Sequence, residues 1–226
     1  MALKNKYFEL SPKQQKRFQV KLGLYSVVII ACISFVLSLI ASYLLLMIPL
    51  IITLTISLIA PFFDVPSLVA QKRLNYYSLF LLGEKERQGT IKIHAGTLFD
   101  YYFVFDKAIG SEERRKLILL EYLKGMMNII QQEKAEISIE GTSYIINERT
   151  AKKIGLKKVQ TNGVQKLILA FNYVNLMVSL FFVKKGVYFP DLSRVSTFRG
   201  QIIDIKKNEQ YIKRLILKIE NFTTTK

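Results

Sequence analysis

A histidine and two aspartates form the only group of residues in the sequence that is suited to proton transfer. His94 is followed by Asp100 and Asp106. An imidazole held by a carboxylate can act as a general base near neutral pH. The even separation of His94 and Asp100 would place both side chains on one face of a strand, although Ala95-Gly96-Thr97 could interrupt that strand. The sequence therefore offers His94 and Asp100 as candidate catalytic residues, and a purely structural histidine is the alternative.

Other catalytic and metal-binding patterns are missing from the sequence. Cys32 is the only cysteine and His94 the only histidine. A disulfide framework, a site with several cysteines and a site with two imidazoles are therefore excluded. No Walker-type phosphate loop and no nucleophile elbow occurs. We therefore expect no metal ion, and none of these motifs points to a cofactor.

An uncharged stretch of 42 residues, Leu22 to Phe63, indicates where the protein lies. A helix crosses a hydrocarbon core of about 30 Å with about 20 residues, so this stretch is twice as long as one crossing requires. It predicts two transmembrane helices, at about Leu22–Tyr43 and Leu44–Phe63, joined by a very short turn, with Pro49 near that turn or early in the second helix. One long tilted span and a re-entrant hairpin are the alternatives.

The charges that flank this stretch predict its orientation. The formal net charge is +16, with six basic residues before the first span and four closely after the second. Basic flanks are typical of the cytoplasmic side. We therefore expect a basic cytoplasmic N-terminus over residues 1–21, both termini in the cytoplasm, and a multi-pass location in the cell's inner (cytoplasmic) membrane. No ionisable residue lies within the spans, which disfavours a channel or transporter.

The excess of basic residues could also indicate nucleic-acid binding, but no recognition motif accompanies it. The bilayer, with its anionic lipid headgroups, is a simpler partner because each lysine or arginine near such a surface adds about 1 kcal/mol of attraction. We therefore expect contacts with anionic headgroups, a membrane protein as a further candidate partner, and no nucleic acid.

The rest of the chain alternates between strand-like and helix-like patterns. Residues 64–83 combine tyrosines with basic and apolar residues, which is typical of an interfacial helix, although a core helix fits equally. Residues 84–226 predict a basic cytoplasmic α/β domain. Its expected elements are strands at Thr90–His94, Leu98–Phe105, Ala135–Glu140 and Leu156–Val159, and helices from Ser111 to about Gln132, from Asn147 to Gly155 and around Tyr211–Ile219. Leu167–Val183 predicts a buried helix or, less simply, a third span.

The order of elements over about residues 98–159 resembles the acyl-CoA-binding half of GNAT-type N-acyltransferases. Its most specific part is the segment Ile145-Ile146-Asn147-Glu148-Arg149-Thr150-Ala151-Lys152-Lys153-Ile154-Gly155-Leu156, where an asparagine follows a strand and an alanine comes four residues later. The resemblance implies an α/β (α+β) domain with a GNAT-like mixed sheet, so the expected fold is a membrane helical hairpin plus this domain. It also implies acyl-CoA as the donor for acyl transfer to an amine of a membrane-associated substrate.

In this family, the positions that match Asn147 and Ala151 lie near the pantetheine arm, and those that match Gly110 and Ser111 lie near the pyrophosphate. His94 or Asp100 would be the base. The sequence departs from the family where Glu112 and Glu113 open the long helix, because their charges would repel phosphate, and where Leu156 replaces the usual phenylalanine. A non-enzymatic membrane component whose basic domain docks a protein partner or lipid headgroups is therefore the alternative.

Overall fold

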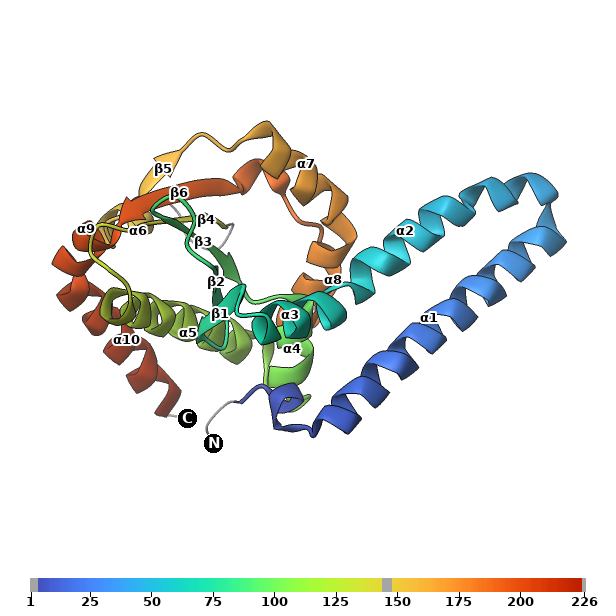
Figure 1. Ribbon diagram of the computed structural model, residues 1–226, viewed down its shortest axis with the longest axis horizontal. Coiled ribbons are helices and arrows are strands. Elements are labelled where there is room, and N and C mark those ends of the chain that lie inside the picture. Colours follow the sequence, from blue (N-terminus) through green and yellow to red (C-terminus); the bar gives the residue numbers. More distant parts are fainter. Residues whose placement is uncertain (1–3, 144–147, 225–226) are drawn as a thin grey trace.

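The computed structural model describes residues 4–143 and 148–224, and it combines a helical hairpin with an α+β domain (Figure 1). A short 3₁₀ helix, η1 (Lys6–Glu9), precedes the first long helix, α1 (Pro12–Ile40). The returning arm consists of a 3₁₀ segment, η2 (Ser42–Met47), and helix α2 (Ile48–Ile59). The two arms project from one side of the domain.

Both arms are long and apolar enough to cross a membrane, which supports membrane association. From Leu22 to Ile40, α1 extends about 28 Å at about 1.5 Å per residue, close to the thickness of a hydrocarbon core. Almost none of the apolar residues of either arm is buried against the protein. The break falls at Ala41, slightly before the expected turn, and Pro49 lies in the first turn of α2 as expected. The second arm ends at Ile59 rather than Phe63, because α3 begins at Pro61.

A mixed sheet forms the centre of the domain. In the described residues it has six strands in the order β1-β2-β3-β4-β6-β5. All neighbouring strands are antiparallel except β3 and β4, which are parallel. The strands are β1 (Leu74–Ser78), β2 (Leu81–Glu84), β3 (Thr90–Ala95), β4 (Ser138–Ser143), β5 (Lys157–Val159) and β6 (Ser196–Gln201). The expected α+β class with a mixed sheet is confirmed.

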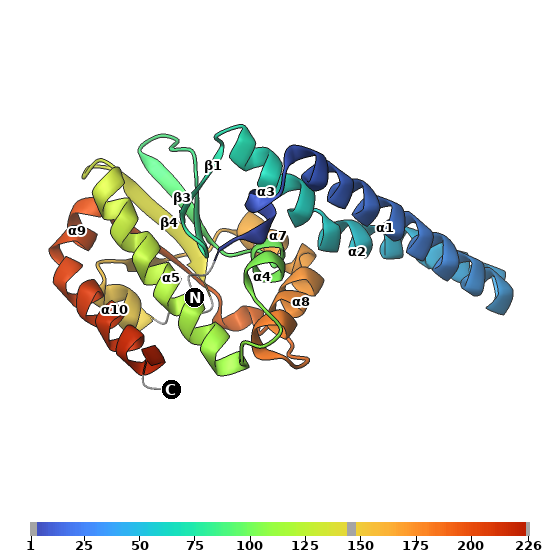
Figure 2. The same ribbon diagram turned by 90° about the horizontal axis from the view of Figure 1, so that it is seen from below.

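Helices cover the sheet and connect its strands. The parallel pair is connected through α4 (Leu98–Val104) and the long α5 (Ser111–Gln132). The other helices are α3 (Pro61–Ala70), α6 (Glu148–Lys153), α7 (Gly163–Phe171), α8 (Tyr173–Lys184), α9 (Ile202–Lys207) and α10 (Glu209–Thr224), with a 3₁₀ turn η3 (Leu192–Arg194) before β6. Figure 2 shows α5 and α10 side by side along one face of the sheet.

The main core lies between that face and α5. Ile91 and Ile93 of β3 point toward this core, and Met126 and Ile129 of α5 are fully buried against them. Because side chains alternate along a strand, Lys92 and His94 of β3 lie on the opposite face. A second, aromatic core joins η1, α3, α4 and the base of the hairpin, and its members include Tyr7, Phe62 and Phe99.

Two predicted elements need correction. The interfacial helix predicted over residues 64–83 ends at Ala70, and the strands β1 and β2 follow it. Leu98–Phe105, predicted as a strand from its aromatic residues, is helix α4. Thr97 and Asp100 form a reciprocal capping box at its first turn, and this local signal outweighs the β propensity of the aromatic residues.

The apolar segment Leu167–Val183 is neither one buried helix nor one straight span. It is divided at Asn172 into α7 and α8, whose axes differ by 64°. Helix α8 buries Ser179, Leu180 and Val183 against the domain, whereas no residue of α7 is buried. The α8 half of this segment therefore packs on the domain, and the α7 half is exposed at the surface.

Candidate functional site

His94 lies at an exposed position on β3, and its partner is Glu84 instead of the expected Asp100. Its Nε2 is 2.8 Å from Oε1 of Glu84 on the adjacent strand β2. The hydrogen bond from His94 is the largest of the effects that lower the pKa of Glu84. The two residues line a hollow of about 610 Å³ together with the basic side chains of Arg73, Lys85 and Arg87.

Asp100 is completely buried at the first turn of α4. One carboxylate oxygen accepts hydrogen bonds from the Thr97 backbone N–H at 2.7 Å and the Thr97 hydroxyl at 2.8 Å. The other accepts from the Tyr76 hydroxyl and, at 3.4 Å, from the Asn5 amide. Burial raises the pKa of Asp100 to about 6, against the opposing effect of the bonds from Tyr76 and Thr97. The structure thus uses Asp100 as a buried cap and cross-link, and His94 is not among its hydrogen-bond partners.

Asp106, the second aspartate of the group, lies in a different place from both His94 and Asp100. The side chain of Asp106 forms an ion pair with Lys6 of η1. Its backbone carbonyl accepts a hydrogen bond from the buried Arg114 guanidinium at 2.7 Å. His94, Asp100 and Asp106 therefore form three separate local networks within the described residues.

The start of α5, where the resemblance implies a phosphate site, is exposed at Gly110, Glu112 and Glu113, and only Arg114 of its first turns is buried. Gly110 is the N-cap and Ser111 the first residue of the helix. Arg114, one turn on, donates to the carbonyls of Ile109 and Phe182 as well as Asp106, and its guanidinium lies over the ring of Phe105. Because Phe182 belongs to α8, this bond joins the end of α8 to the start of α5.

Because Glu112 and Glu113 lie exposed in its first turn and their charges would repel phosphate, this helix start does not fit a pyrophosphate group. Ala151, implied to lie near the pantetheine arm, is fully buried in the main core. Its carbonyl accepts the Leu156 N–H at 2.9 Å, and Gly155 ends the helix with a positive φ of 88°. Asn147 lies outside the described residues. The residues in hand therefore do not build a site for acyl-CoA.

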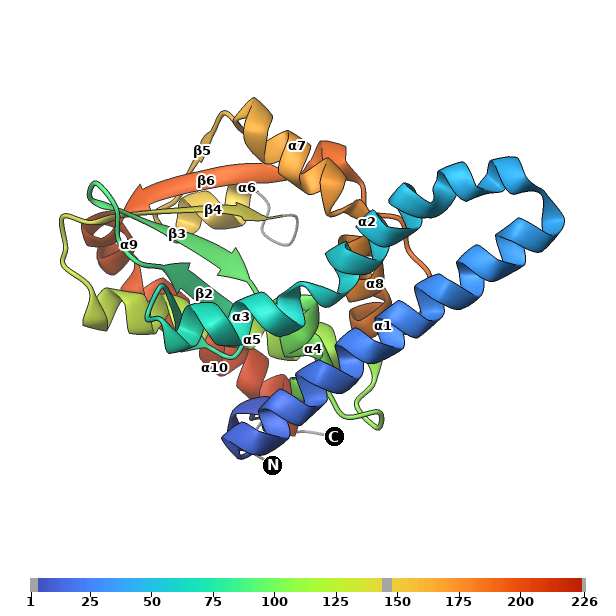
Figure 3. The same ribbon diagram turned by 45° about the vertical axis from the view of Figure 1, so that its right-hand side comes forward.

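The two parallel strands separate at their carboxyl ends. Their register extends from Thr90 opposite Ser138 to Ile93 opposite Gly141. Beyond that point, the end of β3 pairs only with β2, and the end of β4 pairs only with β6. Figure 3 shows the two strands diverging toward α7 and α8. Ligands of open α/β sheets commonly bind beyond the carboxyl ends of the strands, where neighbouring connections diverge.

A cavity of about 480 Å³ lies in this region, between α5 and α8. Val195, just before β6, marks its position, because Ser196 is paired with the last residue of β4. The described lining is mostly apolar and comprises Tyr101 of α4, Arg115, Ile118 and Leu119 of α5, Leu176, Leu180, Val183 and Lys184 of α8, and Phe189, Pro190, Asp191, Leu192 and Val195 of the segment before β6. A volume of this size is typical of small-molecule sites.

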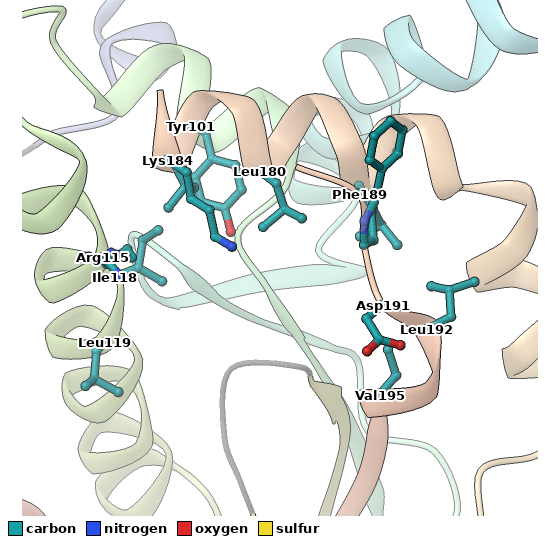
Figure 4. Close-up of a pocket in the computed structure, with 13 residues that line it drawn as sticks. Tyr101, Arg115, Ile118, Leu119, Leu180, Lys184, Phe189, Asp191, Leu192 and Val195 are labelled. Atoms are coloured by element: carbon teal, nitrogen blue, oxygen red, sulfur yellow. The ribbon is translucent and has the colours of Figure 1, made fainter. Parts of the chain in front are cut away.

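The polar groups of the cavity come from both of its sides. Figure 4 shows the Tyr101 hydroxyl and the Lys184 amine pointing into it from one side and the Asp191 carboxylate across from them. Arg115 belongs to the first turns of α5, and the bond from Arg114 to α8 brings that turn to the same end of the cavity as Lys184. In the described part of the chain, neither Arg115 nor Lys184 forms an ion pair. This end of the cavity is therefore cationic.

No motif or spacing in the sequence marks any of these cavity residues as functional. They come from four separated segments, and only the folded chain brings them together. The only local sign of this cavity is the apolar run that contains α8. That run predicts a helix buried in a core and does not indicate a cavity. The sequence-predicted residues lie around the sheet and the α4 cap instead.

Comparisons with known proteins add no family to this geometry: no protein-family model, no curated protein and no solved structure matches the chain.

Proposed function

We propose that this protein is a membrane-anchored binding module that receives a single-chain anionic amphiphile in the cavity between α5 and α8. The apolar walls match an acyl chain, and Arg115 with Lys184 match an acidic head. The observation that carries the proposal is an apolar cavity with two cations at one end, next to helices that reach the base of the hairpin. Neither cation forms an ion pair with a described residue, and the Lys184 amine lies over the Tyr188 ring, 4.3 Å from its centroid.

The bilayer is the natural source of such a ligand. Asn175 of α8 donates a hydrogen bond of 2.9 Å to the Ser57 carbonyl in α2. Val178 and Phe182 of the same helix pack into the aromatic core with Phe18 and Leu58 of the hairpin. One side of α8 thus contacts the membrane arm while another lines the cavity, so an amphiphile leaving the lipid phase would have a short path.

The proposal also includes the location of the protein. The hairpin would cross the inner membrane twice, and the basic flanks would keep both termini and the α+β domain in the cytoplasm. Reporter fusions at Met1 and at Lys226 should both give the cytoplasmic signal. Opposite signals at the two ends would contradict the two-span topology.

Binding can be tested on the full chain in nanodiscs of neutral phosphatidylcholine, with palmitate as the probe. Palmitate at 100 times its dissociation constant should stabilise the protein by about 2.7 kcal/mol. For a chain of this size, that corresponds to a rise in Tm of roughly 5–11 °C. Palmitoyl methyl ester, which keeps the chain without the charge, and acetate, which keeps the charge without the chain, should each give a much smaller shift.

Two variants connect the shift to the cavity. Leu176→Trp places a larger side chain in the cavity and should abolish the palmitate shift, whereas Leu217→Trp on the exposed side of α10 should leave it unchanged. A palmitate shift that is equal in both variants, or absent from the unmodified protein, would overturn the proposal.

Acyl transfer is the second candidate, because the parallel strands β3 and β4 separate at their carboxyl ends, where an acyl donor could enter. The acidic first turn of α5 argues against a CoA donor, so CoA alone should give no shift in Tm. A shift with palmitoyl-CoA far larger than with palmitate would favour the enzyme over the binding module.

A further inference from the structure

Helix α7 carries an apolar face that no described part of the chain covers. Val164, Leu167, Ile168 and Phe171 are 62%, 70%, 54% and 64% exposed. At about 100° per residue, these four side chains occupy an arc of about 100° on one side of the helix. Large apolar residues gathered on an exposed face are characteristic of a surface that contacts a membrane or another protein.

The opposite side of α7 is attached to the domain, so the outward orientation of this face is fixed. The amide oxygen of Gln165 lies 3.4 Å from the Thr197 hydroxyl on β6. Asn162 caps the helix by accepting the Val164 N–H at 2.9 Å, and Gln165 completes the capping box. The exposed arc therefore belongs to a well-formed helix whose Gln165 side faces the sheet.

The position of α7 connects this face to the hairpin. Helix α8 follows after a bend of 64° and is bonded to α2 through Asn175 and Ser57. The views in Figures 1 to 3 agree that α7 and α8 occupy the side of the domain from which α1 and α2 project. A bilayer that surrounds the hairpin would therefore extend toward α7.

Length decides how α7 would meet that bilayer. Its nine residues extend about 14 Å, about half of a hydrocarbon core, so the helix cannot cross on its own. A short amphipathic helix with one apolar face lies in the headgroup region, parallel to the surface. Lys166, which is exposed on another side of α7, can extend toward anionic headgroups.

We propose that α7 is a third membrane contact, which lies on the bilayer surface with the face Val164, Leu167, Ile168 and Phe171 among the lipid chains. This contact would hold the domain at the membrane in one orientation, whereas the hairpin alone would leave it free to tilt. The inference depends on the hairpin and on α7 and does not require a ligand in the cavity.

The absence of tryptophan from the sequence permits a direct test. The full chain carrying Phe171→Trp as its only tryptophan is reconstituted in vesicles of phosphatidylcholine and phosphatidylglycerol. Some of the vesicles contain lipids brominated either near the headgroup or near the chain ends. We expect blue-shifted emission and strong quenching, with more quenching by the bromine near the headgroup.

Two matched variants frame the result. Val28→Trp in the middle of α1 should be quenched best by the deep bromine, and Leu217→Trp on α10 should be quenched by neither. Leu167→Trp repeats the measurement on α7 in case the Phe171 variant does not fold. Adding Leu167→Glu to the Phe171→Trp chain should remove most of the quenching.

The proposal is overturned if the tryptophan on α7 behaves like the one on α10 while the α1 tryptophan is quenched. It is also overturned if the α7 tryptophan is shielded from a water-soluble quencher without lipid quenching and two copies cross-link through α7, because a second copy would then be the occupant. These measurements use no ligand, so the membrane contact of α7 can fail while palmitate binding holds, and the reverse is also possible.

Discussion

Asp100 and the cavity between α5 and α8 both place polar groups inside the domain, but these groups have different partners. Both oxygens of Asp100 accept hydrogen bonds from this chain, and the carboxylate is fully buried. Arg115 and Lys184 instead line an accessible cavity and form no ion pair with a described residue. An acid whose bonds are satisfied internally stabilises the fold, whereas cations left beside an apolar cavity can bind something from outside.

The structural role of Asp100 follows from where its donors come from. Asn5 lies before the hairpin, Tyr76 is on β1, and Thr97 precedes α4. The carboxylate therefore ties the segment that leads into the membrane arm to the sheet and to the aromatic core. This arrangement gives the first test of the comparison.

The largest effect is expected for Asp100→Ala. Removing the carboxylate leaves the Thr97 N–H and the Tyr76 hydroxyl without an acceptor, and each unsatisfied buried group costs about 1–3 kcal/mol. We expect a loss of at least about 3 kcal/mol, seen as a fall in Tm of roughly 6–12 °C. Thermal melts of the full chain in a mild detergent measure this. A change within about 2 °C would show that Asp100 does not hold these segments together.

The pH dependence of stability separates the charge of Asp100 from its shape. Because its pKa is raised from the ordinary value of 3.8 to about 6, the folded state binds this proton more tightly than the unfolded state. The resulting stability is complete below about pH 4 and is lost as the pH rises through about 6. The shift corresponds to roughly 3 kcal/mol at most.

Asp100→Asn removes the titration but keeps an acceptor oxygen. The Tm of the unmodified protein should therefore fall relative to that of the variant between pH 4 and pH 7 and run parallel to it above pH 7. A difference between the two proteins that does not vary with pH would mean that the carboxyl group titrates normally. Melts at matched ionic strength give this comparison.

The same contrast explains which parts of the fold the sequence could predict. The hairpin follows from the lack of charge over Leu22–Phe63, and helix α5 follows from the spacing of its apolar residues. Gly155 could be assigned as a helix end because its positive φ suits glycine. These signals are local, and each comes from residues close together in the chain.

The remaining features depend on contacts between distant segments. Strand β6 is largely polar and has little apolar alternation, yet it pairs with β4 on one side and β5 on the other. The aromatic residues of Leu98–Phe105 favour a strand when read alone, whereas Thr97 and Asp100 cap a helix there. The residue types of His94 and Asp100 suggest proton transfer. In the fold, however, His94 pairs with Glu84 at the surface and Asp100 is buried.

A smaller effect is expected at the cationic end of the cavity. Arg115→Gln removes one charged donor, and hydrogen bonds to charged groups contribute about 1.5–3 kcal/mol. The affinity for palmitate should therefore fall roughly tenfold or more. Lys116→Gln is the matched control, because Lys116 is the next residue of α5 but pairs with Glu112 at 2.9 Å and does not line the cavity. Equal losses in both variants would indicate a general charge effect rather than a site.

The smallest effect is expected for His94→Ala. The pair of His94 with Glu84 is exposed, and exposed ion pairs contribute about 0.2–1 kcal/mol, so Tm should change by no more than about 4 °C. Palmitate affinity should not change, because His94 lies on the sheet face away from α5 and lines a different hollow. Titration calorimetry on the variant in nanodiscs measures that affinity. A loss of palmitate affinity of tenfold or more would place His94 at the ligand. Acyl transfer with His94 as the base would then be favoured over simple binding.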